Sequence, residues 1–306
     1  FLLPLAYPGW QGLSSGLQVK RLVLYALACG ISAVWLWHIR LGLPTWRHTA
    51  LLLPALAYLL VNLLSLSWST HPFSGWVEAV QLFVLVFLFL AFVTLFPSSR
   101  LLLLAGCNTL AGLVVSLIGI GQYLGLGFLT IPSVGLPSST FIFRNLAASY
   151  TIGILPLGLF AFLTDANPKR KWLWGLSSTT MGLFLIYTRT RGAWVATVCA
   201  LVLATLLGFG IRPLRQALVD CFRTAYTCLP VRLLLVLYPM VILAGAWQSA
   251  NTSPKVIQGF DQQKSSLLTA ATSLTSPGSD RGRWVMWEHT AEMIVDHPIL
   301  GVGLGA

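Results

Sequence analysis

The sequence is poor in charge, and above all in acidic residues. Only 9% of its 306 residues are charged, and eight Asp and Glu stand against 19 Lys and Arg. Soluble domains carry roughly 25% charged residues, so the composition excludes an ordinary soluble globular protein. The few acidic residues and histidines also form no Asp-x-Asp pair and no metal-ligand spacing. We therefore expect neither a metal site nor a cofactor.

Cysteine is scarce as well. The chain has five cysteines, an odd number, and three of them lie inside apolar runs. This count and spacing exclude a disulfide framework and a zinc site. We interpret the cysteines as small apolar residues of helices.

Apolar residues dominate the rest of the sequence. They make up 56% of the chain, and the mean hydropathy is +0.80. Such a composition indicates an all-α, polytopic integral membrane protein, because a bilayer needs roughly 20 apolar residues per helix. The chain 1–306 is expected to be a single membrane domain, incomplete at both ends, with a helix stub at 1–6. Eight runs predict full spans: 21–38, 48–68, 76–96, 101–124, 145–163, 172–188, 192–210 and 232–248.

The basic residues indicate how the spans are oriented. Net charge is +11, and ten of the 19 Lys and Arg lie in alternate gaps between spans or, as Arg232 does, at the edge of such a gap. Membrane lipids and the positive-inside rule explain this pattern better than nucleic acid does. The gaps predicted to face the cytoplasm are 39–47, 97–100, 164–171 and 211–231.

This topology leaves Arg144, Arg189 and Arg191 at the outer face, against the usual bias. A charge at membrane depth costs a few kcal/mol or more unless it faces protein, water or a ligand. Arg189 and Arg191 share one short turn, which predicts a site for an anionic group such as phosphate. Snorkelling toward headgroups is the open alternative for each arginine, and it is favoured for Arg144. For Asn145, a helix cap or an interhelical hydrogen bond is favoured over a substrate contact.

The segment 249–306 is predicted to lie outside and to begin a large outer loop. Residues 249–282 are polar and read as a loop, whereas 283–297 has the pattern of an amphipathic helix. Trp284 and Trp287 fall on its apolar stripe, which suits a helix at the membrane–water interface.

Three segments in this order resemble the O-antigen ligase/polymerase superfamily. They are STFIFRNLAASY at 139–150, TRTRGAW at 188–194, and the run from RGRWVMW at 281–287 to DHPILGVG at 296–303. The resemblance covers roughly 139–306, while residues 1–138 are similar only in their pattern of spans. Asn145 matches the asparagine that opens a span after the first outer loop. Arg191 matches the arginine of a Ser-Arg-Gly-type turn, with Thr190 in place of serine, and Arg283 matches an arginine four residues before an aromatic.

The resemblance implies a metal-independent membrane glycosyltransferase of the O-antigen ligase or polymerase type. Such an enzyme would transfer a glycan from an undecaprenyl-pyrophosphate donor to lipid A-core, another glycan or a protein. The reaction would take place at the periplasmic face of the bacterial inner membrane, in lipopolysaccharide or polysaccharide biosynthesis. The implied catalytic residues are Arg191 and Arg283, which would grip the pyrophosphate. The implied substrate-binding residues are Arg144, Asn145, Arg189 and Arg281.

Two further expectations follow from the resemblance. The histidine thought to activate the acceptor hydroxyl would lie in the large periplasmic loop beyond Ala306, so residues 1–306 alone are expected to be inactive. An anion transporter of the bicarbonate type, an anion-binding membrane protein and a membrane scaffold are the alternatives. A transporter should have polar residues in mid-span and internal repeats. The sequence has neither, so glycan transfer is favoured.

Overall fold

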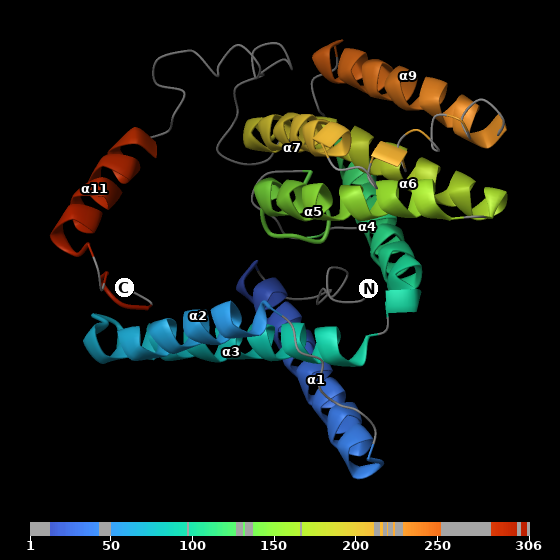
Figure 1. Cartoon of the computed structure of the whole chain (residues 1–306). Helices are drawn as coiled ribbons and strands as arrows, with labels where there is room; N and C mark the ends of the chain where they lie inside the picture. Colours follow the sequence, from blue (N-terminus) through green and yellow to red (C-terminus); the bar gives the residue numbers. More distant parts are fainter. Residues whose placement is uncertain are drawn as a thin grey trace. The chain divides into compact units, whose positions relative to one another are not determined.

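The computed structural model of the chain describes residues 13–42, 50–96, 98–126, 131, 137–165, 167–210, 215–216, 219, 223, 229–251, 283–298 and 301–304. All elements in these ranges are helical (Figure 1). They are α1 (Leu13–Arg40), α2 (Leu52–Ser65), η2 (Leu66–Trp68), α3 (Pro72–Leu95), η3 (Ser98–Arg100), α4 (Leu101–Tyr123), α5 (Arg144–Thr164), α6 (Pro168–Tyr187), α7 (Arg191–Gly210), α9 (Leu229–Asn251) and α11 (Arg283–Asp296).

The all-helical class predicted from the sequence is confirmed for the described residues, and their apolar helices suit a membrane protein. A helix lies at each of the eight positions where an apolar run predicted a span. Within the part of the chain that the structure describes, four helical segments are long and apolar enough to cross a bilayer: Gln18–Arg40, Pro72–Val93, Leu101–Tyr123 and Arg144–Thr164. The count of eight full spans therefore stays a prediction for α2, α6, α7 and α9. The predicted stub at 1–6 lies outside the described residues.

Helix boundaries follow local sequence signals. Pro72 and Pro168 occupy the first positions of α3 and α6, where the missing N–H of proline costs nothing. Asn167 caps α6 by accepting a hydrogen bond from the backbone N–H of Lys169 at 3.0 Å. A short polar side chain in this position satisfies one of the unpaired N–H groups of the first turn.

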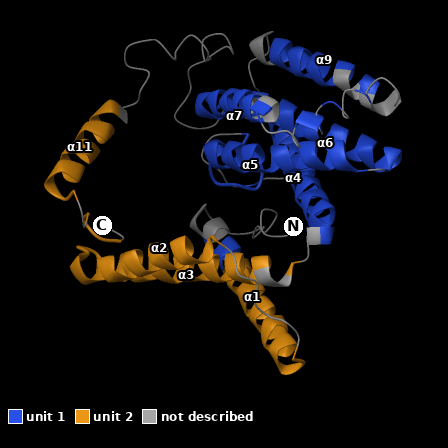
Figure 2. Ribbon diagram, viewed as in Figure 1, with its two compact units in different colours: residues 1–21, 99–275 blue, residues 22–98, 276–306 orange. Residues whose placement is uncertain are grey.

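The described residues group into two compact units (Figure 2). One comprises residues 1–21 and 99–275, and the other comprises residues 22–98 and 276–306. The boundary falls inside α1, and the two units are described separately below.

In the unit that contains α4 to α9, close packing of small residues forms the core. Helix α6 packs against α4, α5 and α9. Gly106, Gly112 and Gly119 of α4 face side chains of α6, and a Cβ added to them would lie 2.9, 2.6 and 2.0 Å from Trp174, Met181 and Phe184. Small residues let membrane helices approach closely, and the gain in van der Waals contact holds them together.

A buried carboxylate fixes the short connection between α5 and α6. Asp165 has a fully buried side chain that accepts hydrogen bonds from Trp174 Nε1 at 2.9 Å, Arg170 Nη2 at 3.0 Å and the Asn167 N–H at 2.9 Å. Burial by itself would raise the pKa of Asp165, but these hydrogen bonds and the Arg170 charge hold that pKa below its ordinary value. The network stabilises the C-terminal end of α5, at the opposite end of the helix from Arg144.

In the other unit, the turn after α11 docks on the connection between α2 and α3. Ser69 Oγ donates to the Leu304 carbonyl at 2.8 Å, and the Leu304 N–H donates to Ser65 Oγ at 3.1 Å. Gly303 adopts φ +93°, and a Cβ there would lie 2.7 Å from the backbone of Ser69. Only glycine suits this position. The contact requires both segments to lie on the same side of a membrane, as the predicted topology has them.

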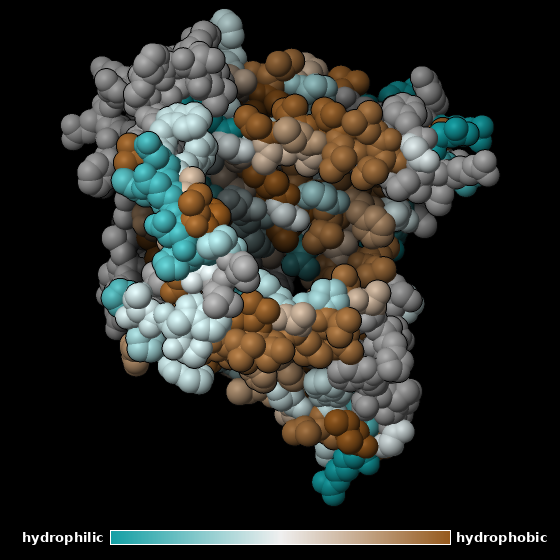
Figure 3. Space-filling model, turned by 60° about the vertical axis from the view of Figure 1, so that its left-hand side comes forward, coloured by the Kyte–Doolittle hydropathy of each residue, from teal (hydrophilic) through white to brown (hydrophobic). Residues whose placement is uncertain are grey.

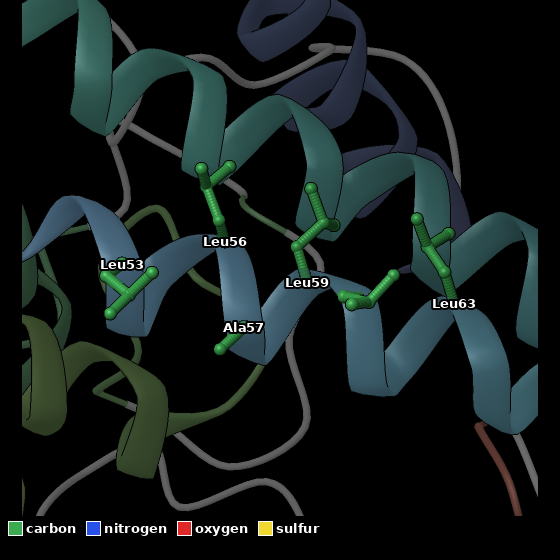
Figure 4. Close-up of a pocket in the computed structure, with 6 residues that line it drawn as sticks. Leu53, Leu56, Ala57, Leu59 and Leu63 are labelled. Carbon is green, nitrogen blue, oxygen red and sulfur yellow. The ribbon is translucent and has the colours of Figure 1, made fainter.

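Apolar side chains are exposed in both units, and brown areas mark such residues on the face shown in Figure 3. Leu53, Phe73 and Leu243 are 78%, 84% and 69% exposed, which suits contact with lipid rather than water. A shallow hollow of about 450 Å³ lies along α2, and its lining consists of leucines and Ala57. Leu56, Leu59 and Leu63 point from α2 toward α3 (Figure 4). With no polar group in its lining, this hollow cannot bind an anion.

Candidate functional site

The turn between α6 and α7 places two arginines close together in the chain. Thr188 forms the C-cap of α6, and Arg189 follows it with φ +49°. This left-handed conformation commonly ends helices, but glycine usually adopts it. Arg191 is then the first residue of α7, and both arginine side chains are half-buried. The indole Nε1 of Trp194 donates to the Leu185 carbonyl at 3.0 Å and ties the start of α7 to the last turn of α6.

Side-chain contacts join this turn to two other helices. Thr190 Oγ1 donates to Asn145 Oδ1 in the first turn of α5, at 3.3 Å. Arg189 Nη2 donates to the hydroxyl of Tyr123 in the last turn of α4, at 3.5 Å. The ends of α4, α5, α6 and α7 therefore meet at one place. We call this place the arginine site and define it by Arg144, Asn145, Arg189, Thr190 and Arg191.

The arginine site combines cationic side chains with helix N-termini. Arg144 and Arg191 are the first residues of α5 and α7. A helix N-terminus carries a partial positive charge, so a cation in its first turn is unfavourable by about 0.3–1 kcal/mol. The same N-terminus presents unpaired N–H groups that bind anions. An anion between the two N-termini would therefore offset both the dipoles and the guanidinium charges.

Two buried tyrosines, at the ends of α4 and α6, pack beside the arginine site. The rings of Tyr123 and Tyr187 stack with centroids 4.1 Å apart and planes 7° from parallel. The Tyr187 hydroxyl donates to Gln248 Oε1 of α9 at 2.8 Å. Sequence reasoning missed these three residues, because a tyrosine or glutamine at the end of an apolar run is typical of any membrane–water interface.

The loop that leads into α5 is also tied to its neighbours. Lys20 Nζ donates to the Thr140 carbonyl at 2.9 Å and lies 3.8 Å from the ring centroid of Phe141. A lysine at the end of a membrane helix commonly snorkels to headgroups. The structure instead gives its ammonium group a carbonyl and an aromatic face within the protein.

The six residues predicted as catalytic or substrate-binding fall into two groups. The structure brings Arg144, Asn145, Arg189 and Arg191 to one site in one unit. Arg283 opens α11 in the other unit, and its side chain lies outside the described residues, as does all of Arg281. The expectation that Arg191 and Arg283 hold one pyrophosphate thus stays a prediction.

The predicted amphipathic helix at 283–297 is present as α11. Its described side chains are exposed, and the rings of Trp284 and Trp287 meet edge to face at 5.1 Å. His289 Nδ1 and Glu292 Oε2 lie 3.1 Å apart on the polar side. Its position at a membrane interface stays a prediction.

Among the described residues, no group of three or more His, Cys, Asp or Glu is placed to hold a metal ion. Residues 176–306 match the family model described as O-antigen ligase. This range includes the α6–α7 turn, α11 and the docked turn at 301–304. No curated protein and no solved structure matches the chain.

Proposed function

We propose that this chain, whose residues 176–306 match the O-antigen ligase family model, is a member of that superfamily and binds the diphosphate of a lipid-linked glycan donor at the arginine site. The donor would be undecaprenyl-pyrophosphate-linked, and the glycan would pass to lipid A-core, another glycan or a protein. The arginine site would face the periplasm from the inner membrane. The family match supports glycan transfer and does not support the transport alternative.

The chemistry of glycosyl transfer explains why arginines would be used. The acceptor oxygen forms a bond to the anomeric carbon while the bond from that carbon to the phosphate oxygen breaks. The leaving diphosphate takes the bonding electron pair, and the acceptor hydroxyl gives up its proton to a base. Negative charge thus builds on the phosphate oxygens. A guanidinium group stays charged at all relevant pH values and binds two such oxygens at once.

The single observation that carries the proposal is the meeting of α5 and α7 at their N-terminal ends. Thr190 contacts Asn145 across this junction, and Arg144 and Arg191 begin the two helices. Fixed cations and N–H groups in a poorly hydrated place stabilise developing negative charge without reorganising. Between residues 101 and 219 the sequence has one carboxylate, that of Asp165. Asp165 lies at the C-terminal end of α5, and a helix of this length is about 30 Å long. The acid and the arginine site are therefore well separated.

We assign separate roles to the arginines. Arg191 would bind the phosphate next to the anomeric carbon, where charge develops, and Arg283 of the outer segment would complete the grip on the diphosphate. Arg189, Arg144 and Asn145 would bind the donor before reaction, together with Arg281.

Substitution of Arg191 by lysine tests the proposal in the full-length protein. Arg191→Lys keeps the charge and loses the two-pronged hydrogen bonding, so glycan transfer in membranes supplied with lipid-diphosphate donor should fall by about 10²–10³-fold. Arg40→Lys is the matched control, because Arg40 is exposed at the end of α1. Its transfer rate should equal that of wild type. Wild-type transfer by Arg191→Lys at equal protein level would refute the role of this arginine.

Metal removal provides a second check. If arginines stabilise the leaving group, transfer in membranes treated with EDTA should proceed at the untreated rate. Loss of transfer that added Mg²⁺ or Mn²⁺ restores would show that a metal ion takes that role.

A further inference from the structure

The last two residues of α4, Gln122 and Tyr123, contact different parts of the arginine site. Consecutive helix residues point about 100° apart, so neighbouring side chains reach different elements. Gln122 faces the loop that leads into α5, and Tyr123 faces α6 and the turn that follows it. Both side chains are buried.

Gln122 holds the loop before α5 with three hydrogen bonds. Its Oε1 accepts from the N–H groups of Ser138 and Ser139 at 3.1 and 2.7 Å, and its Nε2 donates to the Ser139 carbonyl at 3.0 Å. Ser139 has φ +56°, which is uncommon for a residue other than glycine. Its hydroxyl donates to the carbonyl of Val115, two turns earlier on α4. The loop is thus fixed on one face of α4, five residues before Arg144.

Tyr123 supports the turn between α6 and α7 instead. Its ring stacks on Tyr187, the last residue of α6, and its hydroxyl lies 3.5 Å from Arg189 Nη2. The rings are buried, so they offer no face to a sugar. The Tyr187 hydroxyl is already bonded to Gln248, and the Tyr123 hydroxyl is the part of the pair that touches an arginine of the site.

We propose that Gln122 and Tyr123 are positioning residues that set the spacing of the two halves of the arginine site. Gln122 acts through the loop on Arg144 and Asn145, and Tyr123 acts on Arg189. This inference rests on the proposed function, since it assumes that these groups bind the donor diphosphate. The end of α4 thus holds both the loop before α5 and the α6–α7 turn in place.

The Tyr123→Phe variant isolates one of these contacts. Phenylalanine keeps the stacked ring and removes the hydroxyl near Arg189. Loss of a hydrogen bond to a charged group should raise the KM for the lipid-diphosphate donor by about fivefold. The kcat should stay within twofold, and the thermal unfolding of the purified protein should be unchanged. Tyr58→Phe, an exposed tyrosine of α2, should leave both kinetic constants unchanged.

Double variants decide whether Tyr123 acts through Arg189. In an Arg189→Ala background, Tyr123→Phe should add no further rise in KM, because the group it positions is gone. An equal rise in both backgrounds would overturn the proposal for Tyr123. In the same way, Gln122→Met should raise KM in the wild type and have no added effect when Arg144→Ala and Asn145→Ala are both present. If Gln122→Met fails to accumulate, the Tyr123→Phe cycle still decides the outcome.

A binding measurement separates this inference from the proposed function. Farnesyl diphosphate, a short prenyl diphosphate, is titrated into the detergent-solubilised full-length protein. Tyr123→Phe should weaken its binding about fivefold, and the effect should vanish with Arg189→Ala. This result would support the positioning role even if Arg191→Lys retained wild-type transfer. Undetectable binding to the wild type, or equal binding by wild type and Tyr123→Phe, would overturn it.

Discussion

Thr190 donates a hydrogen bond to Asn145 at 3.3 Å, and this one contact joins two segments that lie 45 residues apart. Asn145 begins α5, whereas Thr190 sits between Arg189 and Arg191. Sequence reasoning favoured a helix cap or an interhelical hydrogen bond for Asn145 over a substrate contact, and the structure gives its side chain a partner in the α6–α7 turn. The contact brings Arg144 and Arg191 into one neighbourhood.

Removal of the Thr190 hydroxyl should weaken donor binding. Thr190→Val keeps the shape of the side chain but cannot donate to Asn145, so transfer should fall about three- to tenfold. Thr190→Ser keeps the hydroxyl donor and gives the serine of the Ser-Arg-Gly-type turn that this segment resembles, so it should retain transfer. Both are measured as initial rates in membranes. Thr180→Val, two turns before the end of α6, is the control and should leave the rate unchanged. Equal rates for Thr190→Val and Thr190→Ser would contradict the role of the hydroxyl.

The predicted topology can be tested with single cysteines in a variant whose five native cysteines are replaced. His71→Cys, before α3, should react with a membrane-impermeant maleimide in intact cells. Lys169→Cys, at the start of α6, should react only after permeabilisation, because the positive-inside rule places the basic 164–171 connection in the cytoplasm. Labelling of Lys169→Cys but not of His71→Cys from outside would reverse the orientation of every helix.

Two glycines should respond to alanine in opposite ways. A Cβ at Gly119 of α4 would lie 2.0 Å from the ring of Phe184, whereas one at Gly153 of α5 meets nothing within 4 Å. Gly119→Ala should therefore destabilise the protein by about 1–3 kcal/mol through overpacking. Gly153→Ala should stabilise it by about 0.5–1 kcal/mol, because alanine favours the helix. Thermal unfolding in detergent measures both, and equal shifts would show that α4 and α6 are not in such close contact.

Acid should remove the contribution of Asp165 to stability. Its pKa lies below the ordinary 3.8 in the folded protein, so the charged form stabilises the fold above that value. The contribution is lost as pH falls through the folded-state pKa. Near neutral pH, Asp165→Asn should lower stability by about 1–3 kcal/mol, and the difference from wild type should shrink under acid. Asp296→Asn, exposed at the end of α11, should show no such difference.

If the difference in unfolding midpoint between wild type and Asp165→Asn did not change with pH, the carboxylate charge would contribute nothing to stability. The measurement is the midpoint of thermal unfolding at a series of pH values from neutral to below 3.8, the ordinary pKa of the group.

The sequence by itself determined the class of this protein and the ends of its helices. Low charge, long apolar runs and prolines in the gaps are local properties, so they placed α2 to α7 and α9 within about four residues, whereas α1 begins at Leu13, eight residues before the predicted span. The two arginines of the α6–α7 turn were also visible, because a charge between apolar runs is costly wherever the helices pack.

The tertiary structure decided which distant residues accompany those arginines. Gln122, Tyr123, Tyr187 and Gln248 look like ordinary interfacial residues in the sequence, and their partners lie between 16 and 66 positions away. Such contacts depend on how α4, α5, α6 and α9 pack. Packing of membrane helices follows the fit of small and large side chains, such as Gly119 on Phe184, rather than the periodicity of any one helix.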